Sequence, residues 1–305
     1  MLLHQFQWRS LFLLSVPVGL LGIVLTLRIA RDPMPSQRKP LDLPGQLSAI
    51  VALAGLVFVL IEGRVLGWGA RPILQGTGIT VLAWVIFLAV EARTAYPMLP
   101  LGFFRSSVFT ASTLASMASA FGFYGLLFVF SLYFQQVRGY TPLRAGMAFL
   151  PWTALVGVSS AMSRRIMAHF GTRWPTSLAF ALMATGTLSL LLFTPYPSYV
   201  QMIVPLMTIG LGLGFVTPAA TAPAMGTVDA PRAGVAAGVL NAARQLGAAI
   251  GVAVCGSLVS AQATMTAGLR AVLWVTASVA LAAAAYWCLA LAPATRTRLQ
   301  LHADR

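Results

Sequence analysis

The segment "RAGVAAGVLNAARQLGAAIG", Arg232 to Gly251, lies inside a long apolar run and consists mostly of small residues, yet it carries Asn241, Arg244 and Gln245. Successive residues of a helix are rotated by about 100°, so these three side chains fall in one narrow sector. A charge at mid-bilayer costs roughly 2.5–3.5 kcal/mol on insertion scales and almost always faces a bundle interior or a wet cavity. The segment therefore predicts a membrane helix whose polar stripe faces other helices.

The composition places the whole chain in a membrane. Of its 305 residues, 58% are hydrophobic and 9% are charged, and the mean hydropathy is +0.84. A soluble domain carries about 25% charged residues, so a soluble fold of this composition could not cover its own surface. The net charge of +14 is then typical of basic loops that orient helices at a lipid bilayer. Nucleic-acid binding is not expected, because neither an aromatic-interleaved basic patch nor zinc-ligand spacing occurs.

Nine segments are long and apolar enough to span a bilayer, which takes about 20 mostly apolar residues. They are separated by linkers with turn and charge signals, none of which could hold a soluble domain. The segments are 10–28, 46–63, 72–91, 108–134, 143–163, 174–194, 199–222, 233–260 and 267–292. The sequence thus predicts an all-α, polytopic membrane helix bundle of about nine transmembrane helices.

The distribution of Lys and Arg predicts the orientation of these helices. If the loop after the first helix is cytoplasmic, thirteen of the twenty basic residues lie on that side and six on the other, with Arg244 inside a helix. The positive-inside rule then places the N-terminus outside and the C-terminus in the cytoplasm. Such a start is hard to insert, and an odd number of further upstream helices would resolve the difficulty.

Small residues and prolines predict where helices approach closely or bend. The run "GLGLGFVTPAATAP" has the glycines of a phosphate loop, but no strand precedes it, so that interpretation is rejected. A role in packing or in a gating helix fits a membrane span better. The expected positions of gating or close packing are Gly210, Gly214, Pro218, Gly234, Gly238, Gly247 and Gly251.

Aromatic and amide side chains in "FYGLLFVFSLYFQQ", Phe123 to Gln136, could contact a substrate. Aromatic rings with few polar anchors suit flat, apolar, cationic molecules. The alternative is that this stretch faces lipid or the protein core, and that Arg244 merely tethers a neighbouring helix. The candidate substrate-path or helix-packing residues are Asn241, Arg244, Gln245, Tyr124, Tyr133 and Gln136.

Acidic residues are scarce, which bears on proton coupling and on catalysis. Coupling normally uses a carboxylate inside the membrane, but all six acids lie in loops or at helix ends: Asp32, Asp42, Glu62, Glu91, Asp229 and Asp304. Glu62 is the nearest candidate, and its plainer interpretation is a helix-end partner of Arg64. With acids and histidines so scattered, an enzyme is not expected, nor is a metal or other cofactor. Cys255 and Cys288 are interpreted as packing residues.

The segment from Arg232 to Gly251 resembles the penultimate helix of the fourteen-helix drug:proton antiporters of the major facilitator superfamily (EmrB/QacA type). Their pattern there is approximately RAG-x3-G-x2-N-x2-RQ-x-G-x3-G. "WRSLFLLSVPVG" near the start resembles the family's sixth helix, and "LYFQQVRGYTPLRAGMAFLP" resembles the loop between its ninth and tenth. The resemblance covers essentially the whole chain and assigns its helices to the sixth to fourteenth only, so that the first five are lacking.

This resemblance implies a division of the chain. Residues 1–30 would be the last helix of the N-terminal bundle, 31–107 two extra linker helices and their loops, 108–292 the six-helix C-terminal bundle, and 293–305 a cytoplasmic tail. The superfamily's signature loop would be absent, and its weak echo is "RRIMAHFG", where Ala168 and His169 replace the acid and the arginine.

The resemblance also implies a function. It indicates a transporter of the bacterial plasma (inner) membrane that exports hydrophobic or cationic small molecules by proton antiport when complete. A complementary N-terminal bundle would be its partner. A truncated chain is not expected to transport alone. The alternative is a non-transporting accessory membrane subunit.

Overall fold

The structure is a computed structural model of the chain and describes residues 9–29, 42–94, 97, 99–193 and 198–292. The chain divides into two compact units, Met1–Leu41 and Asp42–Arg305. In the first unit the described residues form one apolar helix, α2 (Arg9–Ile29), which contains Pro17. The predicted tail 293–305 lies outside the described residues.

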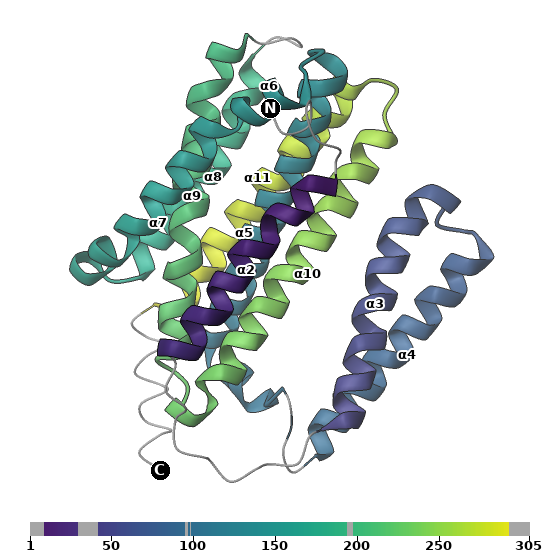
Figure 1. Cartoon of the computed structure of the whole chain (residues 1–305), viewed down its shortest axis with the longest axis vertical. Helices are drawn as coiled ribbons and strands as arrows, with labels where there is room; N and C mark the ends of the chain where they lie inside the picture. The colour runs from purple at the N-terminus through teal and green to yellow at the C-terminus, as the bar shows by residue number, and fades with distance from the viewer. Residues whose placement is uncertain (1–8, 30–41, 95–96, 98, 194–197, 293–305) are drawn as a thin grey trace. The chain divides into compact units, whose positions relative to one another are not determined.

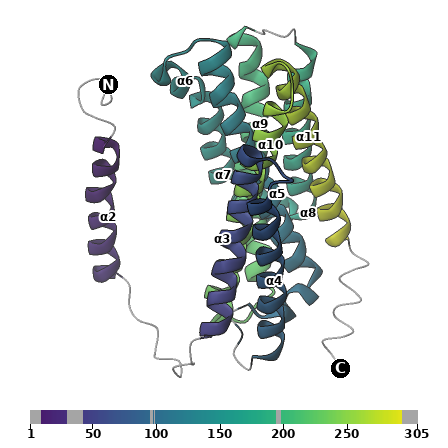
Figure 2. The same ribbon diagram turned by 90° about the vertical axis from the view of Figure 1, so that its right-hand side faces the viewer.

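The second unit begins with a helical hairpin of α3 (Leu43–Leu66) and α4 (Arg71–Arg93). The Asp42 carboxylate accepts a hydrogen bond from the Gly45 N–H at 2.9 Å, which caps the start of α3. Gly67 has a φ of +89°, a conformation that favours glycine, and it turns the chain between the two helices. Figures 1 and 2 show α3 and α4 side by side, and α3 also contacts α10.

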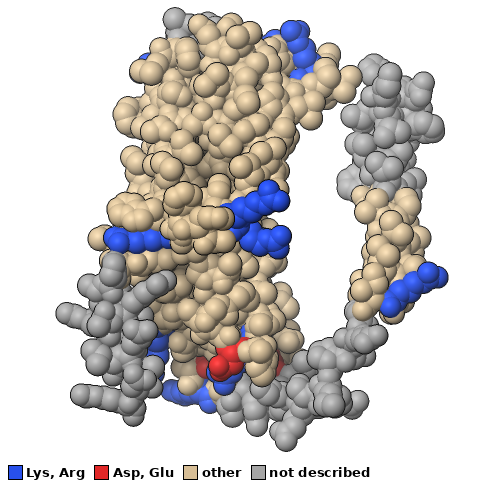
Figure 3. All heavy atoms as spheres, turned by 90° about the vertical axis from the view of Figure 1, so that its left-hand side faces the viewer, with Lys and Arg blue, Asp and Glu red and all other residues tan. Residues whose placement is uncertain are grey.

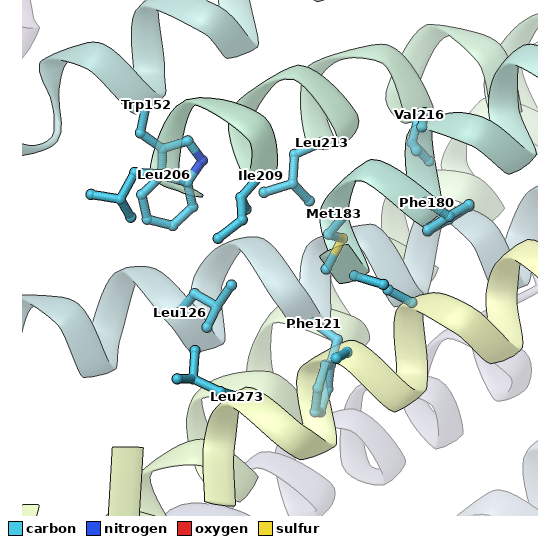
Figure 4. Close-up of a cluster of buried hydrophobic side chains, with 14 of the residues drawn as sticks. Phe121, Leu126, Trp152, Phe180, Met183, Leu206, Ile209, Leu213, Val216 and Leu273 are labelled. Atoms are coloured by element: carbon cyan, nitrogen blue, oxygen red, sulfur yellow. The ribbon is translucent and has the colours of Figure 1, made fainter. Parts of the chain in front are cut away.

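Six long helices pack around a common core in the second unit. Among them α5 contacts α9, α10 and α11, while α8 joins α9 to α11 and α7 packs on α9. Figure 4 shows the core, where Trp152, Met183 and Leu126 interdigitate with other buried apolar side chains. The helices are α5 (Ser107–Leu132), α7 (Leu150–Phe170), α8 (Arg173–Ser189), α9 (Tyr199–Met225), α10 (Ala233–Ser260) and α11 (Met265–Ala290).

The helices have the lengths and hydropathy of membrane spans. Within the described residues, eight helical segments are long and apolar enough to cross a bilayer, and α2 contributes a shorter apolar segment, Ser15–Ile29. On the face drawn in Figure 3 most atoms belong to uncharged residues, as a lipid-embedded surface requires. The predicted all-α, polytopic membrane bundle is therefore confirmed.

Two helix boundaries differ from the prediction. The expected helix 143–163 is divided into α6 (Pro142–Ala148) and α7, with the break at Phe149. Pro151 lacks an N–H and suits the first turn of a new helix better than the interior of an existing one. The basic stretch after residue 163, expected as a linker, is helical, because α7 continues to Phe170 and ends only at Gly171, whose φ is +71°.

Candidate functional site: a cavity on the polar face of α10

An open cavity of about 310 Å³ lies where α5, α7, α9 and α10 meet. Its wall combines apolar side chains with hydroxyl, amide and guanidinium groups, a mixture typical of small-molecule sites. The lining residues are Ser119, Ala120, Phe123, Tyr124, Val156, Leu213, Thr217, Arg244 and Gln245.

Arg244 is the charged residue of this cavity, and a neighbour on its own helix holds it. Its Nη2 donates a hydrogen bond of 2.7 Å to Oδ1 of Asn241, three residues earlier. Residues at this spacing are neighbours on a helix surface, so the contact needs no second helix. Arg244 is half-buried, while Asn241 and Gln245 are exposed. The three polar residues thus share one face, and two of them reach the cavity.

A face of α10 next to its polar stripe packs tightly on α5. A Cβ atom at Gly247 would lie 2.8 Å from the carbonyl carbon of Met117, and one at Gly251 would lie 2.8 Å from Cα of Phe121. Real Cβ atoms do not come so close, so glycine at both positions allows the backbones of α5 and α10 to approach. This contact fixes the rotation of α10 and leaves its polar face toward the cavity.

Gly234 and Gly238 correct one expectation. Gating or close packing was predicted at both, but within the part of the chain that the structure describes, a Cβ atom at either would meet nothing within 4 Å, so only the gating alternative stays a prediction. They lie on the exposed polar side of α10 rather than on the side that packs on α5. Helical rotation places these two glycines on a different face from Gly247 and Gly251, but the sequence does not tell which of the two faces packs on a neighbouring helix.

Of the three residues predicted between Phe123 and Gln136, only Tyr124, on α5, lines the cavity. Tyr124 does so with 43% of its surface exposed, and its ring contacts that of Phe123 edge-on, with 5.0 Å between centroids. Phe123 in turn contacts Trp152 of α7 at 5.6 Å. The aromatic contacts therefore brace Tyr124 against the core.

Tyr133 and Gln136 lie in η2 (Tyr133–Val137), a π-helical turn that ends α5 away from the cavity. Tyr133 is fully buried in the core. Burial lowers the pKa of nearby Arg138, but hydrogen bonds with Tyr140 and Tyr133 raise it, and the net shift is upward. Gln136 is exposed. Neither residue forms part of the cavity wall. The burial of Tyr133 fits the helix-packing alternative of its prediction, and a contact between Gln136 and a substrate stays a prediction.

Four lining residues that sequence reasoning missed follow a helical spacing. Ser119 and Phe123 are four residues apart on α5, and Thr217 lies four residues after Leu213 on α9. Residues at this spacing share a helix face. A search for polar residues one turn from Phe123 or Leu213 could have found Ser119 and Thr217.

The glycines of α9 set its distance from α7. Gly210 packs against Trp152, with 2.8 Å from a Cβ to the indole Cδ1, and Gly214 packs against the carbonyl of Val156. Both are buried, and Pro218 follows within the same helix, directly after Thr217. The structure thus places Gly210 and Gly214 at close contacts between α9 and α7 beside the cavity, while a gating role of these glycines and of Pro218 stays a prediction.

Among the described residues, α3 and α4 carry two acids, Glu62 and Glu91, and neither of them lines the cavity. Glu62 is half-buried on α3. Glu91 is buried at the end of α4, where its Oε2 accepts the backbone N–H of Leu99 at 3.0 Å, so it holds the chain that leads to α5. The sequence placed Glu91 at a helix end but did not reveal its burial. Proton coupling by Glu62 stays a prediction.

The remaining chemistry of the described residues is sparse. No group of three His, Cys, Asp or Glu side chains within them could hold a metal ion. Cys255 is buried and Cys288 half-buried, and both are free thiols.

Comparison with known proteins identifies the family. The Major Facilitator Superfamily profile matches residues 1–252. The chain is 35% identical over 257 residues to the Methylenomycin A resistance protein of Streptomyces coelicolor, covering 84% of this chain and 54% of that protein. It is 32% identical over 266 residues to Multidrug resistance protein Stp of Mycobacterium tuberculosis, with coverage of 87% and 49%. Drug efflux pump JefA of the same organism is 34% identical over 261 residues, with coverage of 83% and 50%.

These matches agree with the bundle of apolar helices and with the resemblance seen in α10. The chain spans about half the length of the curated relatives it matches. Members of the matched family are transporters rather than enzymes. The chain therefore belongs to the Major Facilitator Superfamily and is related to its drug-resistance and drug-efflux proteins.

Proposed function

We propose that this chain forms one wall of the substrate path of a small-molecule exporter, and that the cavity beside Arg244 is where substrate contacts it. The observation that carries the proposal is the convergence of Tyr124, Thr217, Arg244 and Gln245, from three helices, on one open cavity inside an apolar bundle. Intramembrane ionisable residues generally mark substrate or ion pathways. The names of the relatives, which refer to drug resistance and drug efflux, support the same function.

The proposed mechanism is alternating access driven by protons. In such transporters two helix bundles rock about a site near the bilayer midplane. We propose that α5 and α7–α11 act as one bundle, that α3 and α4 are additional helices, and that a complementary N-terminal bundle supplies the opposite wall. We also propose that the N-terminus of the chain lies outside and its C-terminus in the cytoplasm of a bacterial plasma membrane.

The test is drug accumulation in an efflux-deficient bacterium. The chain is expressed alone, or together with the part of the Streptomyces coelicolor relative that its alignment leaves uncovered, and cellular methylenomycin A is measured. We expect the pair to lower accumulation, a protonophore to abolish the effect, and the chain alone to have none. Arg244→Gln in the pair should remove export at an unchanged membrane level.

Two outcomes would contradict this proposal. Proton-driven export by the chain alone would show that no complementary bundle is needed. Unchanged accumulation with the pair, while both parts are present in the membrane and bind each other, would exclude the exporter function. An accessory role would then be the better interpretation.

A further inference from the structure

The charge of the cavity determines which substrates it favours. Arg244 is the one charged residue among those that line it, and the acids within the described residues, Asp42, Glu62, Glu91 and Asp229, are not part of the wall. The cavity therefore has a positive potential. A cationic molecule would be repelled there, contrary to the expectation drawn from the aromatic residues alone.

The guanidinium group has donors left for a ligand. Arginine carries five N–H donors in a planar fork, and within the described residues one bond is seen, from Nη2 to the neutral Oδ1 of Asn241. That bond holds the side chain in place without neutralising it. Two parallel donors of this fork match the two oxygens of a carboxylate.

The rest of the wall suits the apolar part of such a molecule. The rings of Phe123 and Tyr124, together with Val156 and Leu213, offer apolar surface. Thr217 and Gln245 add a hydroxyl and an amide beside the guanidinium. A flat apolar body with one anionic oxygen group would satisfy both parts of the wall.

We propose that the cavity binds planar apolar carboxylates, oriented by Arg244, and discriminates against organic cations. This inference rests on the proposed function only in that the cavity is taken as the substrate site. It adds the class of substrate, which the relatives do not define for this chain.

The test compares three probes with the same anthracene ring: 9-anthracenecarboxylate, 9-(hydroxymethyl)anthracene and the 9-(aminomethyl)anthracene cation. Binding to the full chain in nanodiscs of zwitterionic lipid is followed by probe fluorescence. We expect the carboxylate to bind about tenfold more tightly than the ammonium probe. Arg244→Gln should remove most of this preference, while its affinity for the hydroxymethyl probe should stay within about twofold of that of the parent chain. Arg244→Lys should keep the sign of the preference, because it keeps the charge.

Two further variants sharpen the test. Gln245→Glu places an acid beside Arg244 at an exposed position, where folding should tolerate it. This variant should bind the carboxylate probe more weakly and the ammonium probe more tightly than the parent chain does. Arg232→Gln is the matched control, since Arg232 is an exposed arginine that precedes α10 and is not part of the cavity wall. It should change no affinity.

The possible failures are distinguishable. If the ammonium probe binds best, or if neither Arg244→Gln nor Gln245→Glu alters the preference, the inference about charge is overturned while the cavity remains a binding site. If none of the three probes binds, both the inference and the proposed substrate site are overturned.

Discussion

Arg244 is a charged side chain within a membrane-spanning helix, and among the described residues its hydrogen-bond partner is a neutral amide on the same helix. The hydrogen bond from Nη2 to Asn241 restrains the guanidinium but leaves its charge uncompensated by the described residues around it. A purely structural tether would be expected to reach a neighbouring helix. The observed geometry instead favours a guanidinium group that is oriented to bind a ligand in the cavity.

Replacing Asn241 by Ala should therefore impair binding more than folding. Asn241 is exposed, so losing its hydrogen bond should cost about 1 kcal/mol or less of unfolding free energy. The freed guanidinium should bind the anthracene carboxylate about threefold to tenfold more weakly, because its orientation is no longer restrained. Detergent unfolding and probe titration measure the two effects. Equal carboxylate affinity in the variant and the parent chain would show that Asn241 does not position Arg244.

The shared face of the polar cluster could be derived from the sequence, but the surroundings of the other predicted residues could not. Asn241, Arg244 and Gln245 share a face because helical rotation requires it, and this depends on local geometry alone. The burial of Tyr133 could not be derived in the same way, because it depends on a π-helical turn at the end of α5 and on the packing of distant segments around it.

At the scale of elements, the contact between α5 and α10 decides how the cavity is built. Gly247 and Gly251 bring the two backbones together, and this contact turns the stripe of Arg244 toward α7 and α9. Rotation by 100° per residue shows which residues share a face, but not which face meets which helix. Rotation puts Gly234 and Gly238 on a different face from Gly247 and Gly251, and the structure shows that the second pair is the one that packs on α5.

The difference between the two pairs of glycines is measurable. Gly251→Ala would place a methyl group against the backbone of Phe121, and we expect a loss of about 1–3 kcal/mol in unfolding free energy. Gly238→Ala is the matched control on the open side of the same helix, where alanine should be neutral or stabilise by about 0.5–1 kcal/mol. Unfolding in mixed micelles compares them. Similar values for the two variants would contradict the packing of α10 on α5.

A second pair of variants tests the approach of α9 to α7. Gly210→Ala would bring a methyl group against Trp152 and should also destabilise by about 1–3 kcal/mol. Gly157→Ala on α7 meets nothing within 4 Å and should not destabilise. Because Leu213 and Thr217 follow Gly210 on α9, Gly210→Ala should in addition weaken binding of the anthracene carboxylate. A destabilised variant with unchanged binding would show that α9 does not shape the cavity.

At the scale of the whole molecule, the excess of Lys and Arg on one side predicts the orientation in the membrane. Green fluorescent protein fused to the C-terminus should fluoresce, and alkaline phosphatase fused there should be inactive. Alkaline phosphatase inserted after Trp68, in the turn between α3 and α4, should be active. The reverse pattern of activities would invert the proposed topology.

The spans themselves could be predicted because bilayer thickness sets their length and composition. The extension of α7 to Phe170 could not, because hydropathy ends at the basic residues whereas the helix ends only where Gly171 permits a positive φ. The position of a helix can thus be predicted from hydropathy where it crosses the lipid, but the end of a helix outside the apolar region cannot.

Pro218 has a mechanical consequence for α9. Proline has no N–H, so the carbonyl of Gly214 lacks its usual partner one turn along, and the ladder of backbone hydrogen bonds is interrupted beside Thr217. Helices kink most readily at such a gap, because bending there breaks no bond. A tilt of α9 about this hinge would move Thr217 relative to Arg244, and so change the width of the cavity's mouth without disturbing the packed glycines before it.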